Sequence, residues 1–310
     1  MMQESPKILV TGGNGYIASN LIELLKKENF ECFSTQRKII KTSSKNIFLI
    51  NDINEKTNWA EPLKNIDIVI HAAATNSHRA GNESYESVNI LGSANLAEQA
   101  IKAGVKRFIF LSTIKVNGNS SDLENPFTEK SPLNPQSDAY SSSKALAEVK
   151  LKKISKDSKM ELVIIRLPMV YGEGIKNNFM KLKKIISLRI PLPFKGIENK
   201  RSIIYIRNLT DFIFKLLLKK DLQDIYLICD EGSISTLEMI KILSSNMDVK
   251  IKLFKVPKNI LEFFFNLLFL KNLYQSLFGN LEINCEQSKK NLKWNPPYST
   301  KEGLRNSSLK

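Results

Sequence analysis

The fold is decided by the stretch Val10-Thr11-Gly12-Gly13-Asn14-Gly15-Tyr16-Ile17-Ala18, which follows a short apolar run and opens a helical pattern. Gly12 can adopt a tight turn that is closed to residues with a Cβ atom. Gly15 lets the backbone approach a pyrophosphate, and Ala18 supplies the third small position, where a helix packs closely on a strand. A helix that begins here offers free N–H groups and its positive dipole end to an anion. The stretch therefore predicts a dinucleotide-binding turn, with a simple strand-to-helix turn as the alternative.

The chain around this turn alternates apolar runs with amphipathic stretches. We predict buried strands over residues 7–10, 31–34, 47–50, 66–70, 107–111 and 162–166, and helices over 16–28, 85–103 and 139–155. Near-continuous apolar strands separated by helices indicate a parallel sheet that is covered on both faces. The predicted fold class is therefore α/β, with a doubly wound parallel sheet of Rossmann type.

The pattern changes after Arg166, where prolines and glycines divide the chain into shorter pieces. We predict a dinucleotide-binding domain over residues 1–170 and a smaller C-terminal substrate lobe over 171–310. Further short elements are expected over 203–206, 209–219, 225–229, 236–244 and 251–254, and some of them should return to the main sheet. Ligands of such sheets bind outside the carboxyl ends of the strands, so the smaller lobe is expected to cover that edge.

Composition narrows the class of protein. The chain has 310 residues, of which 42% are hydrophobic, and this suits a large globular core. Its formal net charge is +15. The lysines are spread along the chain, so we expect a compositional bias and no nucleic-acid partner. Cys32, Cys229 and Cys285 form no zinc pattern, and the N-terminus lacks the layout of a signal peptide. A reduced, cytoplasmic setting without a bound metal is expected.

The most hydrophobic stretch covers residues 260–278. It is interrupted by Glu262, Asn266, Lys271 and Asn272, so it falls short of the ~20 apolar residues that a membrane-spanning helix needs. We expect a helix pair that packs inside the substrate lobe. An amphipathic helix in peripheral contact with a membrane is the alternative.

The end of the second strand should select the coenzyme. An acidic residue there holds the ribose 2′-hydroxyl of NAD, whereas an arginine accommodates the 2′-phosphate of NADP. The chain reads Ser34-Thr35-Gln36-Arg37-Lys38 at this point, without a carboxylate and with Arg37 placed for bidentate phosphate contact. We predict NAD(P) as the coenzyme, with NADP favoured over NAD. The alternative is that Arg37 and Lys38 are solvated loop charges.

Other strand ends should line the same coenzyme. Asp52 and Ile53 follow the third strand, and the small residues Ala72, Ala73 and Ala74 follow the fourth. His71 is expected to be structural and His78 to be a loop residue. The full set predicted to contact the coenzyme is Gly12, Gly15, Tyr16, Ile17, Arg37, Asp52, Ile53, Ala72, Ala73, Ala74, Asn89, Ser112, Tyr140, Lys144 and Pro168.

Tyr140-Ser141-Ser142-Ser143-Lys144 has YxxxK spacing on a predicted helix, so its first and last side chains face the same way. A free tyrosine titrates near ~10, and a neighbouring ammonium favours the phenolate. Tyr140 could then move a proton to or from a substrate oxygen. At the end of the fifth strand, the hydroxyl of Thr113 is a candidate to hydrogen-bond that oxygen, with Ser112 as a neighbour or substitute.

At these residues the chain closely resembles the extended short-chain dehydrogenase/reductases, the NAD-dependent epimerase/dehydratase family. TGGNGYIA, DIVIHAAA, VNILGSANL with Asn89, FLSTIKVNG, YSSSK, RLPMVYGEG and KKNLKWNP all occur in the family's order over nearly the whole chain. The resemblance implies that Thr113 contacts a sugar hydroxyl and that Tyr140 and Lys144 are the base and its partner. It also implies that the segment 177–180, with Asn178 and Phe179, holds a sugar diphosphate gripped by Arg201. Pro168 and Met169 would line the nicotinamide and the sugar.

The chain departs from UDP-glucose 4-epimerases at several places. Gln36 stands at the acidic position, and Met169 replaces an asparagine. A late arginine for the uridine ribose has no clear counterpart. Ile114 and Lys115 occupy the places of the acid pair of family dehydratases, so 4,6-dehydration is not expected. The sequence around STIKVNG and PLPF is similar to that of a bacterial subgroup linked to surface polysaccharides. This subgroup resembles both 4-epimerases and reductases of UDP-4-keto-6-deoxy-N-acetylglucosamine.

We therefore expect an NAD(P)-dependent enzyme that transfers a hydride at a sugar carbon of a nucleotide sugar, most simply C4 of a UDP-sugar. Epimerase and 4-keto-sugar reductase both stay open at this point. The alternatives are a reductase of a non-nucleotide carbonyl compound and a non-catalytic NADP-binding sensor. Family members often pair through the helix that carries the Tyr–Lys motif, so a homodimer is expected.

Overall fold

The computed structural model describes residues 5–37, 46–75, 84–134, 138–176 and 178–308. The chain divides into two compact units. The first unit comprises residues 1–118, 131–167 and 213–226, and the second comprises 119–130, 168–212 and 227–310. The main break after Leu167 lies close to the boundary expected at 170. The segment 119–130, expected in the first domain, belongs to the second unit, while 213–226 returns to the first.

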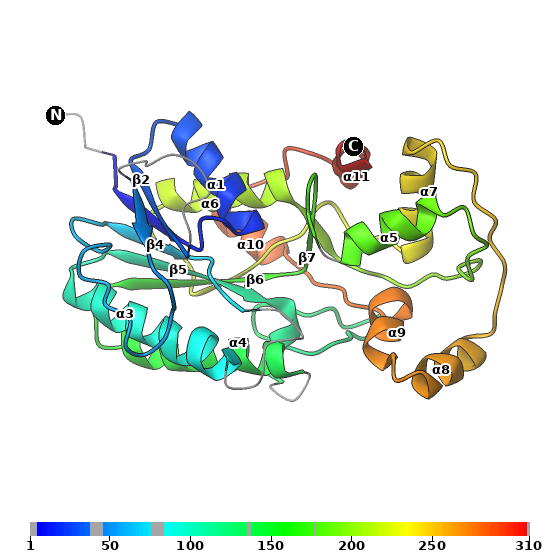
Figure 1. The fold of residues 1–310 in the computed structure, drawn as a ribbon, viewed down its shortest axis with the longest axis horizontal. Coiled ribbons are helices and arrows are strands. Elements are labelled where there is room, and N and C mark those ends of the chain that lie inside the picture. Colours follow the sequence, from blue (N-terminus) through cyan, green and yellow to red (C-terminus); the bar gives the residue numbers. More distant parts are fainter. Residues whose placement is uncertain (1–4, 38–45, 76–83, 135–137, 177, 309–310) are drawn as a thin grey trace. The chain divides into compact units, whose positions relative to one another are not determined.

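The first unit is built on a parallel sheet (Figure 1). Its strands are β1 (Ile8–Thr11), β2 (Cys32–Gln36), β3 (Ile47–Leu49), β4 (Ile68–His71), β5 (Arg107–Thr113) and β6 (Glu161–Leu167), and β9 (Ile225–Leu227) joins at the edge. The strand order is β3-β2-β1-β4-β5-β6-β9. Neighbouring strands from β3 to β6 pair in parallel. This order is that of dinucleotide-binding domains, and the predicted α/β fold is confirmed.

Helices cover both faces of this sheet, with α1 (Tyr16–Lys27) on one face and α3 (Ser93–Lys102) and α4 (Ala139–Ser155) on the other (Figure 1). α1 buries Ala18, Leu21 and Leu25, the spacing of a helix with one core-facing stripe. The helix predicted over 85–103 differs in its first half, because Tyr85–Gly92 is a π-helical segment, η1, that runs directly into α3. Gly92 packs so closely that a Cβ atom there would lie 2.7 Å from Ile53 Cγ2.

The second unit contains a small parallel pair, β7 (Met169–Tyr171) with β8 (Ile203–Tyr205). Its helices are α5 (Asn178–Ser187), α7 (Thr236–Asn246), α8 (Lys258–Leu267), α9 (Lys271–Phe278), α10 (Glu286–Leu292) and α11 (Thr300–Ser308), and α6 (Ile206–Leu218) begins here. Asp230 joins these pieces, because its carboxylate accepts hydrogen bonds from Tyr171 Oη at 2.7 Å and Asn208 Nδ2 at 2.7 Å. The short element expected over 251–254 is neither a helix nor a strand, since Leu253 makes only an isolated bridge with Leu192.

A buried ion pair fastens α4 to the ends of β5 and β6. Arg166 Nη2 donates to Glu148 Oε2 at 2.8 Å, and both side chains are almost fully enclosed. Ser112 Oγ donates to Glu148 Oε1 at 2.5 Å, and Arg166 Nη1 donates to Asn117 Oδ1 at 3.3 Å. Since a buried charge is costly without its partner, this network fixes the position of α4 along the sheet.

We expect each single replacement, Glu148→Leu or Arg166→Met, to lower the free energy of unfolding by about 3–5 kcal/mol, because each leaves an uncompensated buried charge. The double replacement removes both charges and should cost clearly less than the sum of the single losses. Chemical denaturation of the four proteins in a double-mutant cycle measures this coupling. Additive losses would show that the two charges do not depend on each other.

Candidate active site

The glycine turn after β1 is held tightly between neighbouring strands. Gly12 has φ +70°, and a Cβ atom on it would lie 3.0 Å from Ala73 Cα. Gly13 N donates to Thr35 O at 2.8 Å, and Gly15 N donates to Gly12 O at 2.7 Å. Positive φ and the close approach together leave room only for glycine at position 12.

The helix α1 begins directly after this turn, and only backbone groups are available at its start. Gly15 is the N-cap residue, and no side chain among the described residues caps the helix or places an acid in its first turn. Tyr16 and Ile17 form that first turn and are partly exposed. An uncapped helix start with a positive dipole end suits a pyrophosphate. The residues present therefore fit a dinucleotide at the predicted place.

A hydrogen-bonded histidine supports the end of β4. His71 Nε2 lies 2.9 Å from Ser93 Oγ, which itself donates to Asn89 O at 2.7 Å. Since the hydroxyl proton of Ser93 is used in that bond, Nε2 carries the imidazole hydrogen. Nδ1 then accepts from Thr11 Oγ1 at 2.7 Å, and burial lowers the pKa of His71 to about 3. His71 is thus neutral and structural, as predicted from the sequence.

Asn89 connects the loop after β4 to α4. Its side-chain amide exchanges two hydrogen bonds with the backbone of Thr75, at 2.9 and 3.0 Å, and Nδ2 also donates to Ser143 Oγ at 2.9 Å. The loop that carries Ala72, Ala73 and Ala74, all partly exposed, is therefore tied to the helix that carries Tyr140. The sequence predicted coenzyme contact for Asn89, and the structure shows a positioning role for its amide.

The start of α4 is set by Asp138, which sequence reasoning did not identify. Its side chain accepts from Ser141 N at 2.8 Å as the N-cap, and Lys115 Nζ lies 3.4 Å from its Oδ2. The pKa of Asp138 is lowered by these hydrogen bonds and by the Lys115 charge, which outweigh the raising effect of burial. Thr113 ends β5 two residues before Lys115 and is partly exposed. This ion pair links the turn after Thr113 to the helix start beside Tyr140.

Lys144 lies one turn after Tyr140 and is buried. Its Nζ atom is 3.7 Å from the centre of the Phe110 ring on β5, which an ammonium group favours electrostatically. Burial lowers the pKa of Lys144 to about 7, against the opposing effect of Glu148. The charge of Lys144 therefore responds to its surroundings near neutral pH.

Burial, with smaller contributions from Asp138 and Tyr85, raises the pKa of the Tyr140 phenol to about 12. The ring of Tyr85 lies 6.4 Å from that of Tyr140. The Lys144 ammonium was expected to lower the pKa of Tyr140. In the structure, the loss of solvation disfavours the phenolate more than that charge favours it. Tyr140 needs an additional positive charge beside it to serve as a base, and as a phenol it is a competent proton donor.

The remaining residues of the first unit that were predicted to contact the coenzyme differ in solvent exposure. Ser112 is buried, and its hydroxyl donates to Glu148, so it is not free to replace Thr113. Arg37 and Asp52 are exposed, and Ile53 is partly buried. Gln36 lies beside the turn, since a Cβ atom on Gly13 would be 3.4 Å from its Cγ. Lys38 and His78 lie outside the described residues.

Apart from Thr113, the predicted substrate residues lie in the second unit. Asn178 is exposed at the first position of α5, whereas Phe179 is 1% exposed and its ring lies 5.5 Å from that of Tyr171. Phe179 can therefore offer a ligand only its backbone. Pro168 is buried and Met169 is partly exposed, and Asn177 lies outside the described residues.

Arg201 is also in the second unit and is buried. Its Nη1 atom donates to Gln275 O at 3.1 Å and Gly279 O at 3.0 Å, at the C-terminal end of α9. Burial lowers the pKa of its guanidinium to about 10. Carboxylates among the described residues form no ion pair with it. Arg201 thus holds α9 through carbonyl groups, and its predicted grip on a diphosphate stays a prediction.

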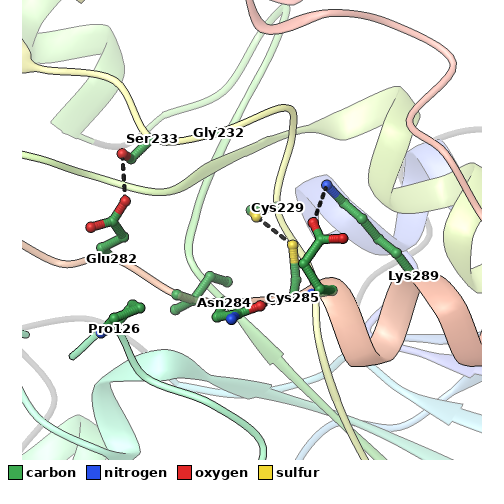
Figure 2. Close-up of a pocket in the computed structure, with 10 residues that line it drawn as sticks. Pro126, Cys229, Gly232, Ser233, Glu282, Asn284, Cys285 and Lys289 are labelled. Carbon is green, nitrogen blue, oxygen red and sulfur yellow. Dashed lines mark hydrogen bonds and ion pairs between the residues drawn. The ribbon is translucent and has the colours of Figure 1, made fainter. Parts of the chain in front are cut away.

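A separate pocket of about 250 Å³ lies within the second unit (Figure 2). Cys229 Sγ and Cys285 Sγ are 2.6 Å apart at its wall. Their mutual hydrogen bond, together with burial, raises the pKa of Cys229, while the same bond lowers the pKa of Cys285. Among the described residues, no cluster of three or more His, Cys, Asp or Glu side chains could hold a metal ion. None of the predicted site residues lines this pocket.

Residues 8–229 match the NAD dependent epimerase/dehydratase family. The UDP-glucose 4-epimerase of Vibrio cholerae is 37% identical over 312 residues, which cover 98% of this chain and 95% of that protein.

Solved structures agree on the fold. A UDP-N-acetylglucosamine 4-epimerase from Bacillus cereus has a TM-score of 0.78 at 16% identity, over 98% of this chain and 99% of that one. A UDP-glucose 4-epimerase from Thermotoga maritima, solved with UDP-glucose, has a TM-score of 0.75 at 21% identity over 97% of each chain. From the family match and the near full-length relative, the chain belongs to the NAD-dependent epimerase/dehydratase family and is an enzyme of the nucleotide-sugar epimerase/dehydratase type.

Proposed function

We propose that this enzyme interconverts a UDP-sugar and its C4 epimer. The observation that carries the proposal is the placement of Tyr140 and Lys144 on α4. They lie one helical turn apart, with Lys144 against Phe110 of β5 and the helix start tied through Asp138 to the residues after Thr113. The 37% identity to the UDP-glucose 4-epimerase of Vibrio cholerae supports the same activity.

In this proposal, five residues share the work of binding and proton transfer. As the phenolate, Tyr140 accepts the proton of the sugar 4-hydroxyl, and as the resulting phenol it returns that proton. The Thr113 hydroxyl orients the sugar oxygen by a hydrogen bond. Lys144 would hold the nicotinamide ribose of the bound coenzyme, and its positive charge would favour the phenolate of Tyr140. The bound coenzyme supplies a nicotinamide ring that can accept and return a hydride. Asn178 and Arg201 are proposed to hold the diphosphate.

Dehydration is not favoured by the residues after Thr113. Ile114 is 1% exposed and belongs to the core, and Lys115 is paired with Asp138. Neither side chain supplies the acid that elimination of water requires.

A 4-keto-sugar reductase is the second candidate, favoured by the end of β2. The uncharged Gln36 lies beside the glycine turn, and the exposed Arg37 follows it. We propose that Arg37 binds a 2′-phosphate and that the site prefers NADP over NAD, as a reductase using external NADPH requires. With either activity, a role in the cytoplasmic synthesis of surface-polysaccharide precursors is proposed.

A homodimer is part of the proposal. Leu146 and Val149 are 49% and 54% exposed on α4, three residues apart and therefore on one helix face. An exposed apolar pair on the helix that carries Tyr140 suits pairing with the same helix of a second copy.

Replacing Tyr140 by Phe should lower the turnover number at least ~100-fold, because the proton-transferring oxygen is lost. Coenzyme affinity should stay close to that of the unmodified enzyme. NMR analysis of products from UDP-glucose, UDP-galactose and their N-acetylated forms, with and without NADPH, measures the activity and separates epimerase from reductase. Tyr226→Phe removes a phenol elsewhere in the first unit and is the control. Unchanged turnover in Tyr140→Phe would refute the proposed chemistry.

Replacing Arg37 by Glu should weaken NADP binding about 10- to 100-fold, the worth of a charge-assisted hydrogen bond, and leave NAD binding equal or stronger. Calorimetric titration with both coenzymes measures the ratio of affinities. Lys27→Glu changes an exposed charge at the end of α1 and should leave that ratio unchanged. An unaltered NADP affinity in Arg37→Glu would leave the proposed preference without a basis.

Gly12→Ala should weaken coenzyme binding at least ~10-fold, because the added Cβ atom displaces the turn that carries the backbone donors. Gly104→Ala is a matched control, since Gly104 also has positive φ, +81°, but a Cβ atom there meets nothing within 4 Å. Both variants carry backbone strain, so only the local clash separates them. Equal coenzyme affinity in the two variants would contradict the predicted role of the turn.

A further inference from the structure

Helices α8 and α9 form a hairpin in the second unit, joined by residues 268–270 (Figure 1). One side of the hairpin is anchored. Tyr274 and Phe278 are buried, and Phe278 stacks on Phe194 with ring centres 5.0 Å apart. Phe265 of α8 lies 5.8 Å from the Tyr274 ring. This aromatic cluster is the packed helix pair that the sequence predicted.

The other side of the hairpin is apolar as well and is exposed. We call it the apolar tip, and it consists of Ile260, Phe263, Phe264, Leu267, Leu268, Phe269, Leu270 and Leu273. Phe269 at the turn is 96% exposed and has φ +57°. The expectation that this stretch packs inside the lobe is therefore only half right.

Because the packed side of the hairpin is already covered, its exposed apolar side needs a separate apolar partner. Soluble monomers rarely leave large contiguous apolar patches in water, and such patches mark interaction surfaces. Of the helices that the structure describes, none is long and apolar enough to cross a membrane. Short helices with exposed Phe and Leu side chains instead suit shallow insertion at the headgroup boundary.

The charged residues in and next to the tip in the sequence indicate the chemistry of its partner. Residues 249–279 contain Lys250, Lys252, Lys255, Lys258 and Lys271, all exposed, and Glu262 as the single acid. Basic side chains beside an apolar insertion attract anionic lipid headgroups. In a symmetric pair of chains the same lysines would face one another, which opposes self-association at this surface.

We propose that the apolar tip is a membrane-docking surface that inserts into the interface of an anionic lipid bilayer, with the flanking lysines on the headgroups. The whole-chain charge of +15 has the same sign and adds attraction at long range. The enzyme would bind peripherally and reversibly.

Co-sedimentation of the full-length protein with vesicles tests this. Vesicles with about 30% phosphatidylglycerol should bind it, whereas pure phosphatidylcholine vesicles should bind at least ~10-fold less, and added salt should weaken binding. Leu267→Ser with Leu268→Ser should lower the partition coefficient at least ~10-fold. Leu123→Ser with Leu218→Ser is the matched control, because these leucines are 55% and 59% exposed against 61% and 63% at the tip.

Two further readouts separate the outcomes. In a Phe269→Trp variant, the emission of the new indole should shift to the blue on anionic vesicles, which locates the contact at the tip. Light scattering without lipid gives the oligomeric state of the Leu267→Ser, Leu268→Ser variant. Equal vesicle binding of the two double variants would overturn the proposal. So would dissociation of an oligomer by the tip variant alone, because the tip would then be a protein contact.

Discussion

The close approach of Gly12 to Ala73 is the constraint on which the site of the first unit depends. A side chain at Gly12 would meet the backbone after β4 at 3.0 Å, so the turn after β1 and the loop after β4 occupy adjoining space only because one of them lacks a Cβ atom. From that loop the contacts continue outward: Asn89 ties Thr75 to Ser143. The turn that would receive phosphates and the helix that carries Tyr140 are thereby linked through the interior of one unit.

The same compact arrangement determines the electrostatics. Glu148 is held between Arg166 and Ser112, so its charge is compensated within the sheet, while Lys144 above it rests on Phe110 without a direct carboxylate contact among the described residues. Burial then lowers the pKa of Lys144 and raises that of Tyr140. Both shifts favour the neutral pair, and a cationic ring bound beside them opposes the shift at Tyr140. Proton transfer is thus made dependent on what the site has bound.

The sequence predicted β1, β4, β5 and β6 well because they are short, mostly apolar runs whose residues are largely buried. The helix α4 has the predicted bounds because Asp138 caps it. Contacts between distant residues could not be predicted. The pairing of Glu148 with Arg166 depends on the register of α4 on β6, and the meeting of Cys229 with Cys285 joins residues that are 56 positions apart. The burial of Phe179 and the exposure of Phe269 could not be predicted either. An apolar pattern shows that a side chain is more stable when buried, but not whether the fold buries it.

Arg201 connects the two proposals that concern the second unit. Its guanidinium is expected to grip a diphosphate, yet it donates to Gln275 O and Gly279 O, where α9 ends. Tyr274 and Phe278, which anchor the hairpin, are on the same helix. A guanidinium has five N–H donors in one plane, so it can serve the carbonyls with one nitrogen and an anion with the others. A diphosphate held in this way would strengthen the attachment of α9. A charge-assisted hydrogen bond to one side of the planar guanidinium would fix its orientation, and with it the bonds to the two carbonyl groups. Substrate binding and the stability of the apolar tip would then depend on one buried side chain.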